Sequence, residues 1–135
     1  MMSAIRFKKS DGKIRHKQIE IDGFKFDSKL ESERYLHLRL LEKAKIISNL
    51  KPHPKFELQE AYRDGDGIAQ RAITYEADFS YEKGGDMVVE DVKSPFTAKD
   101  SVFRIKMKMF KKTYPIYKFY IVMFNKNKGG WFFAK

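Results

Sequence analysis

Four charged residues interrupt a segment whose other residues favour β-strands. Residues 75–94 read YEADFSYEKGGDMVVEDVKS, with Asp78, Glu90, Asp91 and Lys93 on either side of a Lys-Gly-Gly-Asp turn. Because side chains alternate between the two faces of a strand, Asp91 and Lys93 share one face and Glu90 points to the other. The turn brings the segment around Asp78 back towards the end of the second strand. The sequence therefore predicts a pair of carboxylates beside a lysine.

Such a group is suited to binding a divalent cation and to cleaving phosphodiester bonds. Two close carboxylates repel each other, and Mg²⁺ or Mn²⁺ relieves that repulsion by binding their oxygens. A bound cation lowers the pKa of a coordinated water, and a lysine supplies positive charge to a phosphate group. The alternative is simpler. An acidic residue two positions before a lysine on a strand is also typical of a surface ion pair.

A helix that could carry a further carboxylate is predicted over about 29–45. Ser28 and Glu31 have the three-residue spacing of a reciprocal cap at a helix start. The apolar stripe of this helix is expected to comprise Leu30, Leu36, Leu40, Leu41, Ala44 and Ile47. Glu31 lies at the edge of the stripe beside Tyr35 and Leu38, so its side chain can lean towards the core. In the alternative interpretation, Glu31 only caps the helix.

The remaining strands are predicted from apolar runs between turn signals. Asp22-Gly23 indicates a hairpin within 19–26, and Pro52 and Pro54 enforce an extended approach to the next strand. The DGDG run in 63–70 is interpreted as a polar turn, since it lacks the distal glutamate of a calcium loop. Further strands are expected at 55–62, 71–82, 86–93 and 116–124, with a short last strand in GGWFFAK. Helices packed over a mainly antiparallel sheet give an α/β or α+β fold.

A second helix with a basic flank is predicted in SVFRIKMKMFKKTY, after the turn SPFTAKD. Val102, Ile105, Met109 and Phe110 are expected near one apolar face. Much of the remaining surface of this helix carries positive charge, from Arg104, Lys106, Lys108, Lys111 and Lys112. These five residues are the predicted contacts to a phosphate backbone.

The whole chain is basic, which suggests a polyanionic partner. Its 135 residues include 28 Lys and Arg against 18 Asp and Glu, for a formal net charge of +10. DNA is favoured over a membrane surface, because no predicted helix combines a lysine-rich face with a clean apolar one. Residues 1–18 are expected to form a flexible basic arm that adds Lys8, Lys9 and Lys13 to the DNA contacts, and 19–135 a single domain.

Composition excludes several other chemistries. The chain has no cysteine, so disulfides, thiolate zinc sites and cysteine nucleophiles are ruled out. His16, His37 and His53 lack the spacing of a zinc protease. No run of about 18 uncharged apolar residues is present, so we expect neither a membrane span nor a signal peptide, and a cytoplasmic location in a bacterial host.

The combined pattern resembles the PD-(D/E)xK nuclease superfamily. The resemblance rests on Glu31 near a helix start, Asp78 on one strand and the run EDVK on the next. More narrowly, FKFDSKLESERY, ISNLKPHPKFELQ, RAITYEADFSY and VVEDVKS resemble a group of small phage- and prophage-encoded proteins assigned to that superfamily. The resemblance covers about 24–124. Ala77 precedes Asp78, where the superfamily's name has a proline.

This resemblance implies a fold and a set of roles. The fold would be a restriction-endonuclease-like αβββαβ core, a mixed sheet flanked by helices. Asp78 and Asp91 would be metal ligands, Lys93 the catalytic lysine, Glu31 a further ligand or water-orienting acid, and the carbonyl of Val92 an extra ligand. Alternation relative to Lys93 favours Asp91 over Glu90 as the ligand, and Glu90 stays open as the alternative.

The implied activity is that of a Mg²⁺- or Mn²⁺-dependent endodeoxyribonuclease of phage type. Branched DNA such as a Holliday junction is the leading substrate by analogy, and a homodimer is plausible on the same ground. Two other functions remain open. One is a non-catalytic basic DNA-binding module, in which the acidic group is a structural ion pair. The other is a phage protein-interaction factor that modulates a host enzyme.

Overall fold

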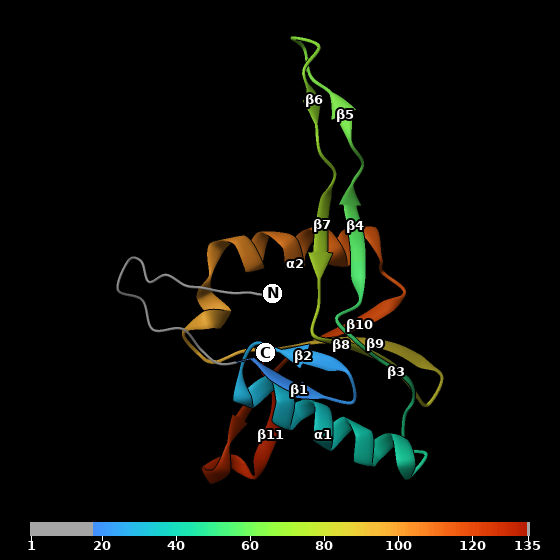
Figure 1. The fold of residues 1–135 in the computed structure, drawn as a ribbon, viewed down its shortest axis with the longest axis vertical. Coiled ribbons are helices and arrows are strands. Elements are labelled where there is room, and N and C mark those ends of the chain that lie inside the picture. The colour runs from blue at the N-terminus through green and yellow to red at the C-terminus, as the bar shows by residue number, and fades with distance from the viewer. Residues whose placement is uncertain (1–17, 135) are drawn as a thin grey trace.

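The structure is a computed structural model that describes residues 18–134, and within that range it is a mixed α+β fold. Two helices of this described part, α1 (Lys29–Lys43) and α2 (Ser101–Thr113), lie on opposite sides of a five-stranded sheet (Figure 1). The sheet strands are, in spatial order, β11 (Gly130–Ala134), β10 (Tyr117–Asn125), β9 (Asp86–Val92), β8 (Phe79–Lys83) and β3 (Ser48–Pro52). None of these helices is long and apolar enough to cross a membrane, among the residues described.

Three small antiparallel strand pairs accompany the sheet. They are β1 (Ile19–Ile21) with β2 (Phe24–Phe26), β4 (Lys55–Gln59) with β7 (Ile73–Glu76), and β5 (Tyr62–Arg63) with β6 (Ala69–Gln70). The predicted first hairpin is confirmed, with Asp22 at φ 55° and Gly23 at φ 84° in its turn. These left-handed backbone angles are what an Asp-Gly pair tolerates.

The sheet is mixed because of one helical crossover. β9 and β10 pair in parallel, with Asp91 opposite Ile121, and α2 makes the connection between them. The other neighbouring strands in the described sheet pair antiparallel. If the strands from β4 to β7 are set aside, α1, β3, β8, β9, α2 and β10 follow one another in the order αβββαβ.

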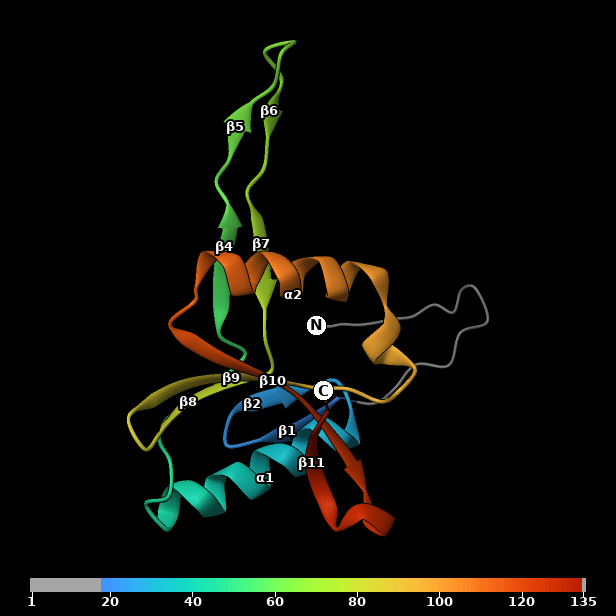
Figure 2. The ribbon, with the colours of Figure 1, turned by 180° about the vertical axis from the view of Figure 1, so that it is seen from behind.

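A two-stranded arm leaves the sheet between β3 and β8. Figures 1 and 2 show that β4 and β7 begin beside α2, and that the arm continues through β5 and β6 well beyond the sheet and helices. The single strand predicted over 71–82 was wrong, because β7 pairs with β4 in the arm whereas β8 belongs to the sheet. The chain changes partners at Ala77 and Asp78, where the Ala77 N–H donates to the Pro54 carbonyl at 3.0 Å. This change places Asp78 at the base of the arm.

The apolar stripe predicted for α1 was wrong in part: Ile47 is buried and Leu41 packs against the core as predicted, but other members of the stripe are not buried. Leu36 and Leu40 are exposed, and the buried face of the helix is instead made by Glu31, Ser32, Arg34, Tyr35 and Leu38. The physical reason is that the buried polar side chains find partners inside the fold. The helix boundaries and the Ser28 cap agree with the prediction, since Ser28 Oγ accepts a hydrogen bond from the Glu31 N–H at 3.0 Å.

In α2 the predicted basic helix is confirmed, but its apolar face is displaced. Phe103 and Phe110, seven positions apart, are buried, whereas Val102 and Ile105 are exposed. Phe103 is drawn inward because its N–H is held at 2.9 Å by the capping carboxylate of Asp100 and its ring packs in the core below.

The hydrophobic core is divided by the sheet into two clusters. The cluster under α1 contains Phe26, Tyr35, Leu38, Ile47, Phe79, Tyr81 and Val88. The cluster under α2 contains Leu58, Tyr75, Ala77, Val89, Phe103 and Phe110. Val88 and Val89 are neighbours in β9 and belong to different clusters, as strand alternation requires. By the same alternation Glu90 faces α1 and Asp91 faces α2.

Candidate metal and catalytic site

Asp78 and Asp91 are held together by hydrogen bonds from the backbone N–H groups of Asp78 and Val92. Asp91 Oδ1 accepts a hydrogen bond from the Asp78 N–H at 2.9 Å, and Asp78 Oδ2 accepts one from the Val92 N–H at 2.7 Å. The Tyr75 hydroxyl donates to Asp91 Oδ2. The side chain of Asp91 is only 3% exposed. The structure thus brings together the carboxylate pair that the sequence predicted, on the α2 side of the sheet.

Glu31 reaches the same site from the start of α1. Its Oε1 accepts a hydrogen bond from the Asp27 N–H at 3.3 Å, and its Oε2 lies 3.1 Å from Nε2 of His53. The carboxyl groups of Glu31 and Asp78 are close enough to perturb each other's pKa. The Glu31 carboxylate therefore lies beside the aspartate pair, and at the helix start it accepts a hydrogen bond from the N–H of Asp27, one residue before the predicted partner Ser28.

Burial dominates the electrostatics of the three carboxyl groups. Burial, and next the charge of Glu31, raise the pKa of Asp78 to about 7, although the Val92 N–H opposes the shift. Burial, and next the charge of Asp78, raise the pKa of Asp91 well above its ordinary value. Burial also raises the pKa of Glu31. The three groups resist being ionised together unless positive charge is supplied.

Lys93 supplies part of that positive charge. It follows β9 on the same face as Asp91, and its charge acts to lower the pKa values of both Asp78 and Asp91. The Lys93 Nζ lies 4.3 Å from the ring centroid of Phe103, a cation–π contact that directs the ammonium across the α2 side of the sheet. Its backbone N–H donates to the Val122 carbonyl at 2.9 Å. The predicted neighbourhood of aspartates and lysine is therefore present.

Glu90 has a different environment from Asp91. Its side chain is fully buried and forms a bidentate ion pair with Arg34. Arg34 Nε donates to Glu90 Oε1 at 2.6 Å, and Arg34 Nη2 donates to Glu90 Oε2 at 2.9 Å. The Tyr81 hydroxyl also donates to Glu90 Oε2 at 2.6 Å. Both oxygens of Glu90 therefore have partners on the α1 side. This geometry makes Asp91 the partner of Asp78, as strand alternation predicted.

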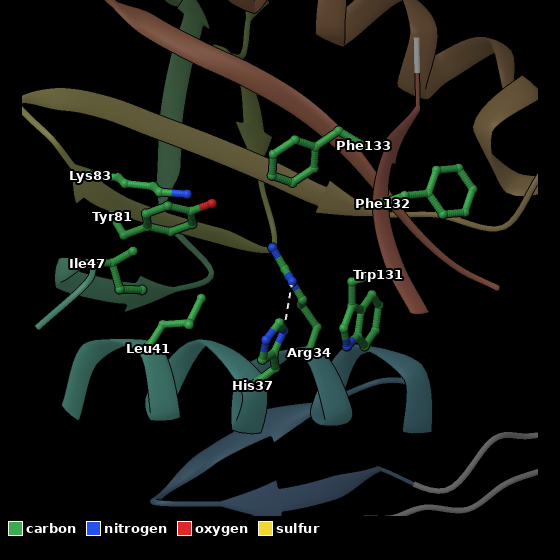
Figure 3. Close-up of a pocket in the computed structure, with 9 residues that line it drawn as sticks. All are labelled: Arg34, His37, Leu41, Ile47, Tyr81, Lys83, Trp131, Phe132 and Phe133. Atoms are coloured by element: carbon green, nitrogen blue, oxygen red, sulfur yellow. Dashed lines mark hydrogen bonds between the residues drawn. The ribbon is translucent and has the colours of Figure 1, made fainter. Parts of the chain in front are cut away.

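A pocket of about 230 Å³ lies beside this ion pair (Figure 3). Arg34 Nη1 lies 3.0 Å from Nδ1 of His37, and the guanidinium is 5.3 Å from the ring centroid of Trp131 in β11. Burial, and next the charge of Arg34, lower the pKa of His37. These contacts fix Arg34 in place and tie α1 to the last strand.

Two residues of the site were missed by sequence reasoning, His53 and Tyr75. His53 has φ 56°, its N–H donates to the Asp78 carbonyl at 2.9 Å, and its imidazole meets Glu31. The flanking Pro52 and Pro54 were the sequence feature that could have indicated a fixed position for His53, because prolines restrict the backbone around the histidine. Tyr75 lies three residues before Asp78, but its contact with Asp91 depends on how β7, which is paired with β4 in the arm, is placed against β9.

The predicted DNA-binding residues fall into two groups. Arg104, Lys108, Lys111 and Lys112 are exposed on α2, and Lys106 is half-buried there. Lys111 Nζ lies 5.6 Å from the ring centroid of Phe119. Lys8, Lys9 and Lys13, with the rest of the predicted arm up to residue 17, lie outside the described residues.

The donor atoms fit a hard divalent cation. In the part of the chain from 18 to 134, no three carboxylate or imidazole groups already stand as a complete metal-binding cluster. Mg²⁺ is bound in many sites by only one or two carboxylates and keeps several waters, so Asp78 and Asp91 suffice for it. The raised pKa values of these two groups mean that added positive charge, such as that of a cation, would stabilise their ionised forms.

The raised pKa of Asp78 predicts that the free energy of unfolding depends on pH. Since the pKa of Asp78 is higher in the folded chain than in the unfolded chain, the free energy of unfolding should fall as the pH rises from about 4 to above 7. The Tm is compared at pH 5 and at pH 8 in the presence of a chelator. We expect the decrease in Tm from pH 5 to pH 8 to be about 5 °C larger in the wild type than in Asp78→Asn. Thermal unfolding followed by circular dichroism measures this difference.

Asp86→Asn is the matched control, because Asp86 is an exposed aspartate on β9 that pairs with Lys118 at 3.1 Å. It should keep the wild-type pH dependence. Parallel pH profiles for the wild type and Asp78→Asn would contradict the raised pKa.

Comparison with known proteins gives one match. The family model described as "Protein of unknown function (DUF1064)" matches residues 11–129. No curated protein and no solved structure matches the sequence. Because the family model spans most of the 135 residues, the chain belongs to the DUF1064 family.

Proposed function

We propose that this protein is a Mg²⁺- or Mn²⁺-dependent endonuclease that hydrolyses phosphodiester bonds of DNA. The observation that carries the proposal is the carboxylate pair of half-buried Asp78 and buried Asp91, with pKa values raised by desolvation, beside the ammonium of Lys93. The αβββαβ order of the core elements supports a restriction-endonuclease-like fold. The net charge of +10 supports a nucleic-acid substrate.

The roles of the residues follow from their contacts. Asp78 and Asp91, with the main-chain carbonyl of Val92, would hold the cation. The chemistry that a cation held by these residues would supply is neutralisation of phosphate charge and a lower pKa for water at neutral pH. Lys93 places a positive charge beside the carboxylate pair for a phosphate oxygen. Tyr75 and the Asp78 N–H fix the orientation of Asp91.

Glu31 and His53 form the second part of the proposed site. Their contact at 3.1 Å places an acid and an imidazole next to Asp78. In this role the pair holds a proton or orients a water near the carboxylates. Glu31 is therefore a further metal ligand or a water-orienting acid in the proposal.

The direct test is to incubate the purified protein with plasmid, linear and four-way-junction DNA. Each substrate is combined with Mg²⁺, Mn²⁺ or chelator. We expect cleavage with either metal and none with chelator, and we propose branched DNA as the preferred substrate and a homodimer as the active form. Intact DNA in every metal-containing reaction would overturn the nuclease proposal.

The exposed basic residues of α2 favour a second candidate, a DNA-binding protein without nuclease activity. In that case DNA would be bound but left intact in both metals. A third candidate, a factor that modulates a host enzyme, predicts negligible DNA binding even at low salt. The same incubation, followed by a binding titration, distinguishes all three.

A salt titration tests the proposed DNA path along α2. Arg104→Gln combined with Lys108→Gln should weaken DNA binding about equally for different sequences, because phosphate contacts carry no base information. The slope of log K against log salt should fall in magnitude by about one to two, since each phosphate contact contributes about 0.9. Fluorescence anisotropy at several salt concentrations gives the slope.

The control for this titration is Lys25→Gln combined with Lys43→Gln. Both lysines are exposed, and they lie in β2 and α1, away from α2. This variant should keep the wild-type slope. An unchanged slope for the α2 variant would place the DNA elsewhere on the protein.

A further inference from the structure

Phe96 presents an unusually exposed aromatic ring close to the proposed site. It is 86% exposed, the highest value among the exposed large hydrophobic residues of the described part of the chain. Most large aromatic side chains bury much of their surface on folding, because exposure of apolar area to water is unfavourable. A ring held out so far suggests a contact with another molecule.

The turn that carries Phe96 is well held by hydrogen bonds. The Ser94 N–H donates to Thr97 Oγ1 at 2.8 Å, and the Thr97 N–H donates to Ser94 Oγ at 3.0 Å. The Ala98 N–H donates to the Ser94 carbonyl at 2.9 Å. A short 3₁₀ turn, Thr97–Lys99, and then α2 follow directly. The ring is therefore presented by an ordered turn and loses little conformational freedom on binding.

This turn adjoins the proposed catalytic lysine. Phe96 and Lys93 line one pocket of about 430 Å³, together with Thr97, Lys99 and Asp100. That volume is within the range of small-molecule sites. Lys93 also interacts with the carboxylates of Asp78 and Asp91. A group that enters the pocket would therefore lie next to the phosphate that Lys93 is proposed to contact.

The charge around the pocket favours a nucleic acid as the partner. Residues 93–112 contain seven basic residues and one acidic residue, Asp100. The Asp100 carboxylate caps α2 by accepting a hydrogen bond from the Phe103 N–H at 2.9 Å. An aromatic ring between lysines is the combination that binds single-stranded nucleic acid, with stacking for the base and positive charge for the backbone.

We propose that Phe96 stacks on an unpaired nucleobase of DNA next to the phosphate at Lys93. In a continuous duplex the faces of each base are covered by its neighbours, so a stacking site selects DNA with an unpaired nucleotide. The preferred substrate would thus carry a single-stranded overhang, a bulge or a branch point beside the bound phosphate. This inference deepens the proposed function and rests on it for the position of that phosphate.

The test compares two DNAs in chelator, where binding is measured without cleavage. One is a blunt duplex, and the other is the same duplex with a single-stranded overhang that contains 2-aminopurine, whose fluorescence reports stacking. We expect the wild type to bind the overhang DNA about tenfold more tightly than the blunt duplex and to change the 2-aminopurine signal. Phe96→Ala should lose the preference and the signal change, and Phe96→Trp should retain both.

Ile116→Ala is the control, because Ile116 is an exposed apolar residue after the other end of α2. It should behave as the wild type, and thermal unfolding should show that all variants fold. The inference would be overturned if Phe96→Ala preferred the overhang DNA as strongly as the wild type does. It would also be overturned if the wild type bound the two DNAs equally tightly. A change in oligomeric mass in Phe96→Ala with unchanged DNA binding would overturn it as well, since the ring would then be a protein contact.

A parallel reaction with Mg²⁺ separates this inference from the proposed function. Preference for the overhang DNA without cleavage would support the stacking site and contradict the nuclease proposal. Cleavage with equal binding of both DNAs would support the nuclease proposal and contradict the stacking site.

Discussion

Asp91→Asn is expected to lower DNA cleavage by at least about a hundredfold while DNA binding stays the same or becomes tighter. Asparagine keeps an oxygen that can accept the hydrogen bond from the Asp78 N–H, so the local structure should survive. It loses the negative charge that a divalent cation needs. Removal of a negative charge near a bound phosphate would also reduce repulsion. Cleavage rates in Mg²⁺ and anisotropy titrations in chelator measure the two effects separately.

Asp86→Asn serves as the control for this variant as well, since it removes the same charge from the other end of β9. Its carboxylate is exposed and paired with Lys118, far along the strand from the proposed site. It should cleave at the wild-type rate. Full cleavage by folded Asp91→Asn would remove Asp91 from the catalytic site.

Arg34→Met is expected to destabilise the protein by about 3–5 kcal/mol. The side chains of Arg34 and Glu90 are 5% and 0% exposed, so the substitution leaves a carboxylate buried without its counter-charge. The Tyr81 hydroxyl alone would remain as its partner. The free energy of unfolding from denaturant titration gives the loss. Adding Glu90→Leu to Arg34→Met should recover part of it, because the unpaired charge is then absent.

Arg39→Met is the matched control on the same helix. Arg39 pairs with Asp22, but the two side chains are about a third and a half exposed, so water already screens the pair. The expected loss of stability is therefore much smaller than for Arg34→Met. If Arg34→Met cost no more than Arg39→Met, the buried pair would not stabilise the fold as described.

These predictions depend on features that the sequence determines to different degrees. The turn at Asp22-Gly23, the Ser28 cap and the basic helix α2 follow from residues within a few positions of one another. The separation of Asp91 from Glu90 is also local, because neighbouring side chains on a strand must point to opposite faces. For that reason the central part of the candidate site, Asp91 with Lys93, was accessible from the sequence.

The tertiary structure decided which partners the buried polar groups have. Arg34 is buried together with Glu90, which lies 56 positions later and meets it at 2.6 Å, and the pair occupies part of the buried face of α1. Likewise, the contacts of His53 with Glu31 and of Tyr75 with Asp91 cross 22 and 16 positions. The spacing of apolar residues along a helix predicts which hydrophobic side chains are buried. A charged side chain is buried only when a partner compensates the cost of its desolvation, and that partner can be distant in the sequence. Such partners are known only once the strands and helices are packed together.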